Sequence, residues 1–156
     1  MAGPIARIAY NCCSHQEKPM PSIFPSEEWL IELKDYINQD EKYAHIARNW
    51  EGDLIFHIEP TGALVEPLCF YLDLWHGKCR SIRMVPAGDP TEAAFDLTAS
   101  YENIVKVLKG KLDPMQAMLT RKLGVKGSMP YMMRNVPTVL EFVRCVQDVT
   151  DKVLGD

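Results

Sequence analysis

The spacing of apolar residues changes twice along this chain of 156 residues and divides it into three parts. Apolar side chains recur every three or four positions in residues 26–50, alternate with other side chains in residues 54–99, and return to the wider spacing in residues 101–154. The wider spacing indicates amphipathic helices, and alternation indicates strands with one buried face. Because helices and strands come in separate runs, the sequence predicts an α+β fold.

The first part predicts two helices. Ser26 is a good N-cap, and the two glutamates that follow it stand where the helix dipole favours carboxylates. The helical spacing breaks near residues 38–40 and resumes in a second, shorter helix. We expect that second helix to end at Gly52.

The alternating part predicts strands near residues 54–58, 69–75, 80–85 and 94–99, and a fifth is expected at residues 123–128. Hairpin-length connections join the first three strands, so these are expected to be antiparallel. The predicted architecture is a five-stranded, antiparallel-dominated sheet covered on one face by helices.

Several capping signals predict the later helices. Ser100 and Asp113 are expected to cap two of them, and Gly110 to end the first. Residues 130–134 predict a methionine-rich turn or short helix. A closing helix is expected from Pro137 through Leu154, because its charged residues fall at helical spacing.

Length and composition limit the organisation and the partners. A flexible N-terminal arm is expected at residues 1–25, where four of the eleven prolines lie, and a single domain at residues 26–156. The 17 basic and 21 acidic residues give no basic excess for a phosphate backbone, so no nucleic acid is expected as a partner. An odd number of cysteines, five, and the lack of a secretory signal predict a cytoplasmic protein.

Residues of the kinds that enzymes use are scattered. The sequence has no nucleophile elbow, no phosphate-binding glycine loop and no His-Glu-x-x-His motif. Cys12, Cys13 and His15 lie in the expected arm, where adventitious thiols are the simplest interpretation. Asp73 and Asp96 alternate with apolar residues on separate strands, as outward polar positions do.

One set of residues has a spacing that a metal could use. His76 and Cys79 flank a glycine turn, with Cys69 across the hairpin and His57 in the preceding strand. Zinc needs three or four ligands, and a turn with an incidental histidine explains the pattern more simply. We expect no enzyme, no cofactor and no metal, and keep an enzyme or metal site at these four residues as a minor alternative.

Flexible apolar side chains gather in the last third of the chain. Five methionines fall between positions 115 and 133, ahead of a valine-rich closing segment. Methionine adapts to irregular apolar partners and is frequent at binding surfaces, although such a stripe is more often ordinary core. The pattern alone leaves both interpretations open.

The segment 94–134 carries a distinctive string of breaks and helix residues. Gly110-Lys111-Leu112 leads into Asp113-Pro114 and Ala117, followed by Lys122-Leu123, Val125-Lys126-Gly127 and Met129. Upstream lie Phe70-Tyr71-Leu72-Asp73-Leu74 and the Gly77-Lys78 turn. Together these motifs resemble the sterol carrier protein family, the small sterol-binding and non-specific lipid-transfer domain, over about residues 54–134.

The resemblance implies an apolar tunnel between the sheet and its helices. It further implies non-catalytic binding and carriage of a hydrophobic ligand such as a fatty acid, fatty acyl-CoA or sterol. The partners it implies are a lipid or other apolar small molecule, at most transient membrane contact, and a possible homodimer. The ligand-binding residues expected on this basis are Phe56, Phe70, Leu72, Leu74, Met84, Phe95, Leu97, Leu108, Met115, Met118, Leu119, Met129, Met132, Val136, Val139, Phe142 and Val143.

A second hypothesis keeps this fold and changes its use. The closing helix would then dock into the groove of its own domain or of a neighbour, and protein side chains would fill the cavity. The protein would in that case be a partner-binding accessory or homodimeric module.

Overall fold

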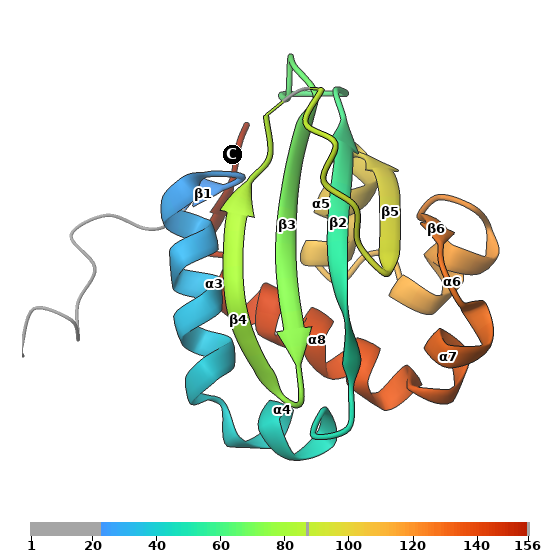
Figure 1. Ribbon diagram of the computed structural model, residues 1–156. Helices are drawn as coiled ribbons and strands as arrows, with labels where there is room; N and C mark the ends of the chain where they lie inside the picture. The colour runs from blue at the N-terminus through green and yellow to red at the C-terminus, as the bar shows by residue number, and fades with distance from the viewer. Residues whose placement is uncertain (1–22, 87, 156) are drawn as a thin grey trace, which may run out of the picture.

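The computed structural model describes residues 23–86 and 88–155 and is shown in Figure 1. Its centre is a five-stranded sheet in the order β4-β3-β2-β5-β6. The strands are β2 (Glu51–Glu59), β3 (Leu68–Trp75), β4 (Lys78–Met84), β5 (Phe95–Ser100) and β6 (Gly124–Lys126). Helices lie behind the sheet and beyond both of its edges, and none of the described helices covers the face toward the viewer. The predicted α+β class and five-stranded sheet are confirmed.

The strand directions are mixed. β2, β3 and β4 form two antiparallel hairpins, as predicted, and β6 is antiparallel to β5. The pair β2 and β5 is parallel, because the chain crosses over after β4 and adds β5 on the far side of β2. The sheet is therefore antiparallel-dominated with one parallel pair.

The first two helices, α3 (Glu27–Gln39) and α4 (Glu41–Ile46), meet at Asp40. Ser26 caps α3, as predicted, by accepting a hydrogen bond from the Trp29 amide at 3.1 Å. Asp40 ends α3 and caps α4 by accepting from the Tyr43 amide at 2.8 Å. The prediction that the second helix runs to Gly52 is wrong, because α4 ends at Ile46 and Gly52 lies within β2.

Three short helices follow β5: α5 (Tyr101–Leu108) and α6 (Pro114–Leu119) come before β6, and α7 (Met129–Arg134) comes after it. The predicted caps are confirmed, since the Ser100 and Asp113 side chains accept from the Asn103 and Gln116 amides. Gly110 follows α5 at φ 75°, a backbone conformation that glycine adopts without strain.

The closing helix α8 (Val136–Val149) is shorter than predicted. Residues 152–153 form the strand β7 (Lys152–Val153), which pairs in parallel with β1 (Ile23–Phe24), so the predicted helix through Leu154 is wrong. The helical spacing of the valines continued past the true end of the helix, but the backbone there makes inter-strand hydrogen bonds to the start of the described chain.

The beginning and the end of the described chain are thus joined. Phe24 is 1% exposed, and its carbonyl accepts from the Leu154 amide at 2.8 Å. Residues 1–22 of the expected arm, with Cys12, Cys13 and His15, lie outside the described residues. Over residues 23–86 and 88–155, no helix has both the length and the apolar character needed to cross a bilayer.

Candidate functional site

An apolar cavity of about 110 Å³ lies between the inner face of the five-stranded sheet and the helices. Side chains of β2, β3 and β5 form one wall, and side chains of α3, α5, α6 and α8 form most of the other. Nearly all of its surface is carbon. A cavity of about 150 Å³ with aliphatic and aromatic walls stays dry and holds benzene, so this space suits an apolar group of similar size.

The sheet wall follows from the alternation along the strands. Leu54, Phe56 and Ile58 on β2 point to the same face, and all three line the cavity. Phe56 lies at the centre: its ring stacks on Phe70 of β3 at a centroid distance of 5.2 Å and faces Phe142 of α8 at 6.4 Å. Phe56 therefore connects the sheet to the helix across the cavity.

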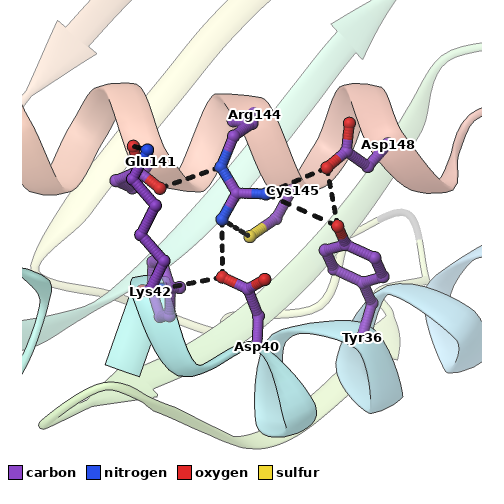
Figure 2. A network of polar contacts seen from close by, with 8 residues as sticks. Tyr36, Asp40, Lys42, Glu141, Arg144, Cys145 and Asp148 are labelled. Atoms are coloured by element: carbon purple, nitrogen blue, oxygen red, sulfur yellow. Dashed lines mark hydrogen bonds and ion pairs between the residues drawn. The ribbon is translucent and has the colours of Figure 1, made fainter. Parts of the chain in front are cut away.

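The helix wall depends on α8, which has two different faces. Val139, Phe142, Val143 and Val146 follow one another at intervals of three, one and three, which places them on one face, and all four line the cavity. The opposite face carries charged residues. It contacts the junction of α3 and α4 and is not free in solvent (Figure 2).

Arg144 is the centre of that charged face. Its guanidinium donates to three carboxylates, those of Asp40, Glu141 (2.8 Å) and Asp148 (2.9 Å). Tyr36 of α3 donates its hydroxyl to Asp148 at 2.6 Å (Figure 2). Because Asp40 and Tyr36 belong to the α3–α4 region, the network attaches α8 to that region while its other face borders the cavity.

The electrostatics keep the network in its charged form. Hydrogen bonds, with Glu141 first and Asp40 also contributing, raise the pKa of the Arg144 guanidinium and outweigh the effect of desolvation. The hydrogen bond to Asp148 raises the pKa of the Tyr36 hydroxyl, which therefore stays a donor. Arg144 thus remains a fixed cation between α8 and the α3–α4 junction.

The α3 end of the cavity is closed by aromatic packing. Trp29 is 1% exposed, its ring meets Phe24 edge-on at 4.7 Å, and its Nε1 donates to Thr150 Oγ1 at 2.9 Å. Leu33 lies on the same face of α3 and is fully buried. This end therefore combines apolar packing with a hydrogen bond to the end of α8.

Many of the residues expected to bind the ligand do meet at this cavity. Those that line it are Phe56, Phe70, Leu74, Leu97, Leu108, Met118, Met132, Val139, Phe142 and Val143. The others do not border it: Leu72, Met84, Phe95, Met115, Leu119, Met129 and Val136.

The residues that fall outside the cavity wall have identifiable positions. Leu72 is 0% exposed and packed within the core, and Leu119 is 72% exposed at the end of α6. The ring of Phe95 packs between Gly52 and Gly127. A Cβ atom added to Gly52 would lie 2.9 Å from this ring, and one added to Gly127 would lie 2.7 Å from it, so both positions need glycine for the ring to fit. Strand alternation alone could not distinguish Leu72 and Phe95 from the strand residues that line the cavity.

Other lining residues were not expected. Leu54 and Ile58 share the alternation of Phe56, and this signal could have found them. Trp29 and Leu33 belong to the apolar stripe of α3, but nothing local shows that α3 reaches the cavity. Phe24 lies next to a proline in the expected arm, where the sequence has no periodic signal.

The four possible metal ligands do not form one site, although His57 and Cys69 are cross-strand partners on β2 and β3. His76 Nε2 pairs with Glu51 at 2.7 Å, and His57 Nε2 lies 3.3 Å from Asp96. Cys79 is 1% exposed, and its thiol donates to the Ser81 carbonyl. Within the described ranges, no group of three or more His, Cys, Asp and Glu side chains has a geometry that could hold a metal ion.

Solved structures with the same fold were identified. A crystal structure of sterol carrier protein 2 aligns with a TM-score of 0.72 and 28% identity, covering 80% of this chain and 98% of that one. The solution structure of a conserved hypothetical protein from Thermus thermophilus, described as possibly a sterol carrier protein, aligns with a TM-score of 0.72 and 27% identity, covering 85% and 93%.

More distant structures share only the fold. Palmitated SCP2L2 from Aedes aegypti aligns with a TM-score of 0.50 and 16% identity, covering 74% of this chain and 93% of that one. Among curated proteins, no relative matches the sequence.

The family itself is established by the sequence. Residues 33–139 match the SCP-2 sterol transfer family, and this range contains β2 to β6 and most of the cavity wall. The match covers more than half of the chain and confirms the resemblance seen in residues 54–134. The protein belongs to the SCP-2 sterol transfer family.

Proposed function

We propose that the protein binds an apolar ligand, such as a fatty acid, fatty acyl-CoA or sterol, in the cavity and carries it without catalysing a reaction. The apolar cavity between the sheet and α8 is the observation that carries this proposal. Palmitated SCP2L2, which shares the fold, supports a fatty acid as one class of ligand.

Burial alone can supply the binding free energy. Each buried methylene contributes about 0.8 kcal/mol, and binding costs at least about 4 kcal/mol of lost motional freedom. A cavity of about 110 Å³ is close in size to one that holds benzene, so a long chain requires the wall to move outward. Apolar contacts have no direction, so weak selectivity among chains is expected.

A titration with a fluorescent fatty acid tests the proposal. The variant Val143→Phe adds a ring at a lining position of α8, whereas Leu140→Phe adds the same ring at a position that is 40% exposed on the same helix. Val143→Phe should weaken binding by at least about tenfold, equivalent to about 1.4 kcal/mol, and Leu140→Phe should leave it within about twofold.

Two results would count against the carrier. Equal binding by both variants would place the ligand elsewhere. A folded wild-type protein without saturable binding below about 50 µM would exclude a carrier of useful affinity. If sedimentation then showed a dimer, the partner-binding module would be the better explanation.

We also propose a cytoplasmic location. Cys69, Cys79 and Cys145 are free thiols in the described part of the chain. Unpaired cysteines suit a reducing compartment. Fractionation of cells that express the tagged full chain tests this.

A further inference from the structure

The segment between Glu102 and Glu141 has a charge opposite to that of the rest of the chain. It contains seven basic residues and one acidic residue, Asp113, although the whole chain has 17 basic and 21 acidic residues. By contrast, α3 has four acidic residues and one basic residue. Figure 1 shows α3 at one edge of the molecule and α6, β6 and α7 at the other. The acidic helix α3 and the basic residues of the α6–α7 region therefore lie on opposite sides of the molecule.

The basic side chains of this segment face solvent. All seven are exposed: Lys106, Lys109, Lys111, Arg121, Lys122, Lys126 and Arg134. Among residues 23–86 and 88–155, no carboxylate forms an ion pair with Arg121, Lys122, Lys126 or Arg134. Their charge is thus available to an external anion.

Large apolar side chains are exposed among these charges. Leu119 is 72% exposed, Met133 49% and Met129 38%. Met129 and Met133 are four residues apart on α7 and so lie on the same helix face. Met129 also shares an outer groove with Arg121 and Lys126, and the groove contains one carboxylate, Asp96, which pairs with His57. Arg121, Lys126 and Met129 therefore share one surface, and Leu119, Lys122 and Met133 are exposed close to them in the chain.

This surface lies directly outside the cavity. Met118 and Leu123 line both the internal cavity and the outer groove, so they form the wall between the two, and the neighbouring Lys122 also borders the cavity. In α6, which has six residues, Ala117 is the buried residue. The wall at this point consists of a short helix and a three-residue edge strand.

We propose that the docking face, formed by Leu119, Arg121, Lys122, Lys126, Met129 and Met133, binds the surface of an anionic lipid bilayer. The inference rests on the proposed carrier function and places the exchange of ligand at the α6–β6 wall. The basic residues lie near the lipid phosphates, and the leucine and methionines insert among the headgroups. Each basic residue near such a surface strengthens binding by about fivefold.

Charge complementarity favours a bilayer as the partner. The exposed cations surround apolar side chains, and this is the combination that binds the boundary between headgroups and acyl chains. The acidic helix α3 is repelled by the same surface, so the field of the bilayer turns the docking face toward it.

Flotation of the full chain with vesicles tests the proposal. Binding is measured to phosphatidylcholine vesicles with and without phosphatidylserine. Three proteins are compared: the wild type, the variant Arg121→Gln/Lys122→Gln/Lys126→Gln, and the control variant Lys34→Gln/Arg48→Gln/Lys78→Gln. Both triple variants lose three positive charges, but the control loses them elsewhere. Binding to phosphatidylserine vesicles should fall by about 100-fold in the first and by less than about threefold in the control.

A second variant tests the apolar part. Leu119→Ser/Met133→Ser should weaken vesicle binding by about tenfold, while the loss of binding in rising salt stays the same. Both substitutions are at exposed positions outside the cavity wall and should leave fatty acid binding in solution unchanged.

The outcomes separate the docking face from the carrier function. If the wild-type protein binds the fluorescent fatty acid but does not bind phosphatidylserine vesicles, the proposal of the docking face is wrong and the proposed carrier function is unaffected. An equal loss in the control triple variant also overturns the docking face. The docking face is also overturned if the wild-type protein is a dimer that does not bind vesicles and the Leu119→Ser/Met133→Ser variant is a monomer. If the protein binds vesicles through the docking face but does not bind the fatty acid, the proposal of the docking face is supported and the proposed carrier function is overturned.

Discussion

The two ends of the cavity are built differently. At the α3 end, a helix of thirteen residues buries Trp29, Leu30, Leu33 and Ile37, each at most 2% exposed. At the other end, α6 and α7 have six residues each and bury Ala117 and Met132. One end is core, whereas the other is a thin wall with exposed apolar residues.

The difference indicates where the molecule can open. Buried apolar area supplies most of the free energy that opposes local unfolding, and it is concentrated at the α3 end. The Arg144 network attaches α8 to this same end. A ligand that needs more room should therefore displace α6 and β6 before α3 or α8.

Truncation of Trp29 should have the largest effect on stability. Trp29→Ala removes a buried indole, its edge contact with Phe24 and its hydrogen bond to Thr150. The expected loss in the free energy of unfolding is about 3–5 kcal/mol, measured by urea unfolding. Leu119→Ala at the other end should change it by less than about 0.5 kcal/mol. Equal losses would show that the two ends are not energetically different.

Local signals predicted much of the fold correctly. Ser26, Ser100 and Asp113 cap helices as expected, because a cap depends on residues within one turn of each other. The hairpins of β2, β3 and β4 depend on short turns and are equally local. The mixed direction of β5 is a non-local property, since it depends on which strand edge the chain returns to.

The features that were missed depend on contacts between distant residues. Val153 continues the helical spacing of α8, but the backbone of β7 pairs with β1, more than a hundred positions earlier. Alternation puts Phe56 and Phe70 at the cavity, whereas Leu72 has the same pattern and lies within packed core. Which inward side chain borders empty space depends on how the helices lie over the sheet, and strand alternation does not contain that information.

Removal of Arg144 should have the next largest effect. Arg144→Met leaves the carboxylates of Asp40, Glu141 and Asp148 without their shared cation. Since the group is 29% exposed, the expected loss is about 1–3 kcal/mol in the free energy of unfolding.

Arg134→Met is the matched control for that experiment. It removes a positive charge from the exposed face of α7, and the expected change is less than about 0.5 kcal/mol. If both variants lost the same amount, net charge would explain the result and the attachment of α8 to the α3–α4 junction would carry no special energy.

Ionisation of the Cys145 thiol at alkaline pH should lower the free energy of unfolding by less than the Trp29 substitution, and it is the smallest of the three effects predicted. Burial raises the pKa of the Cys145 thiol from 9.0 to about 12. An unfolded chain releases this proton above pH 9 and the folded chain does not, so stability is complete below that pH and falls as pH rises toward the folded value. One such thiol costs about 1.4 kcal/mol at about pH 10. Between about pH 8 and about pH 10, the free energy of unfolding of Cys145→Ala should therefore fall by about 1.4 kcal/mol less than that of the wild type. Val149→Ala, also buried on α8 but without a titratable group, should keep the wild-type pH dependence, and a Cys145→Ala curve parallel to wild type would contradict the argument.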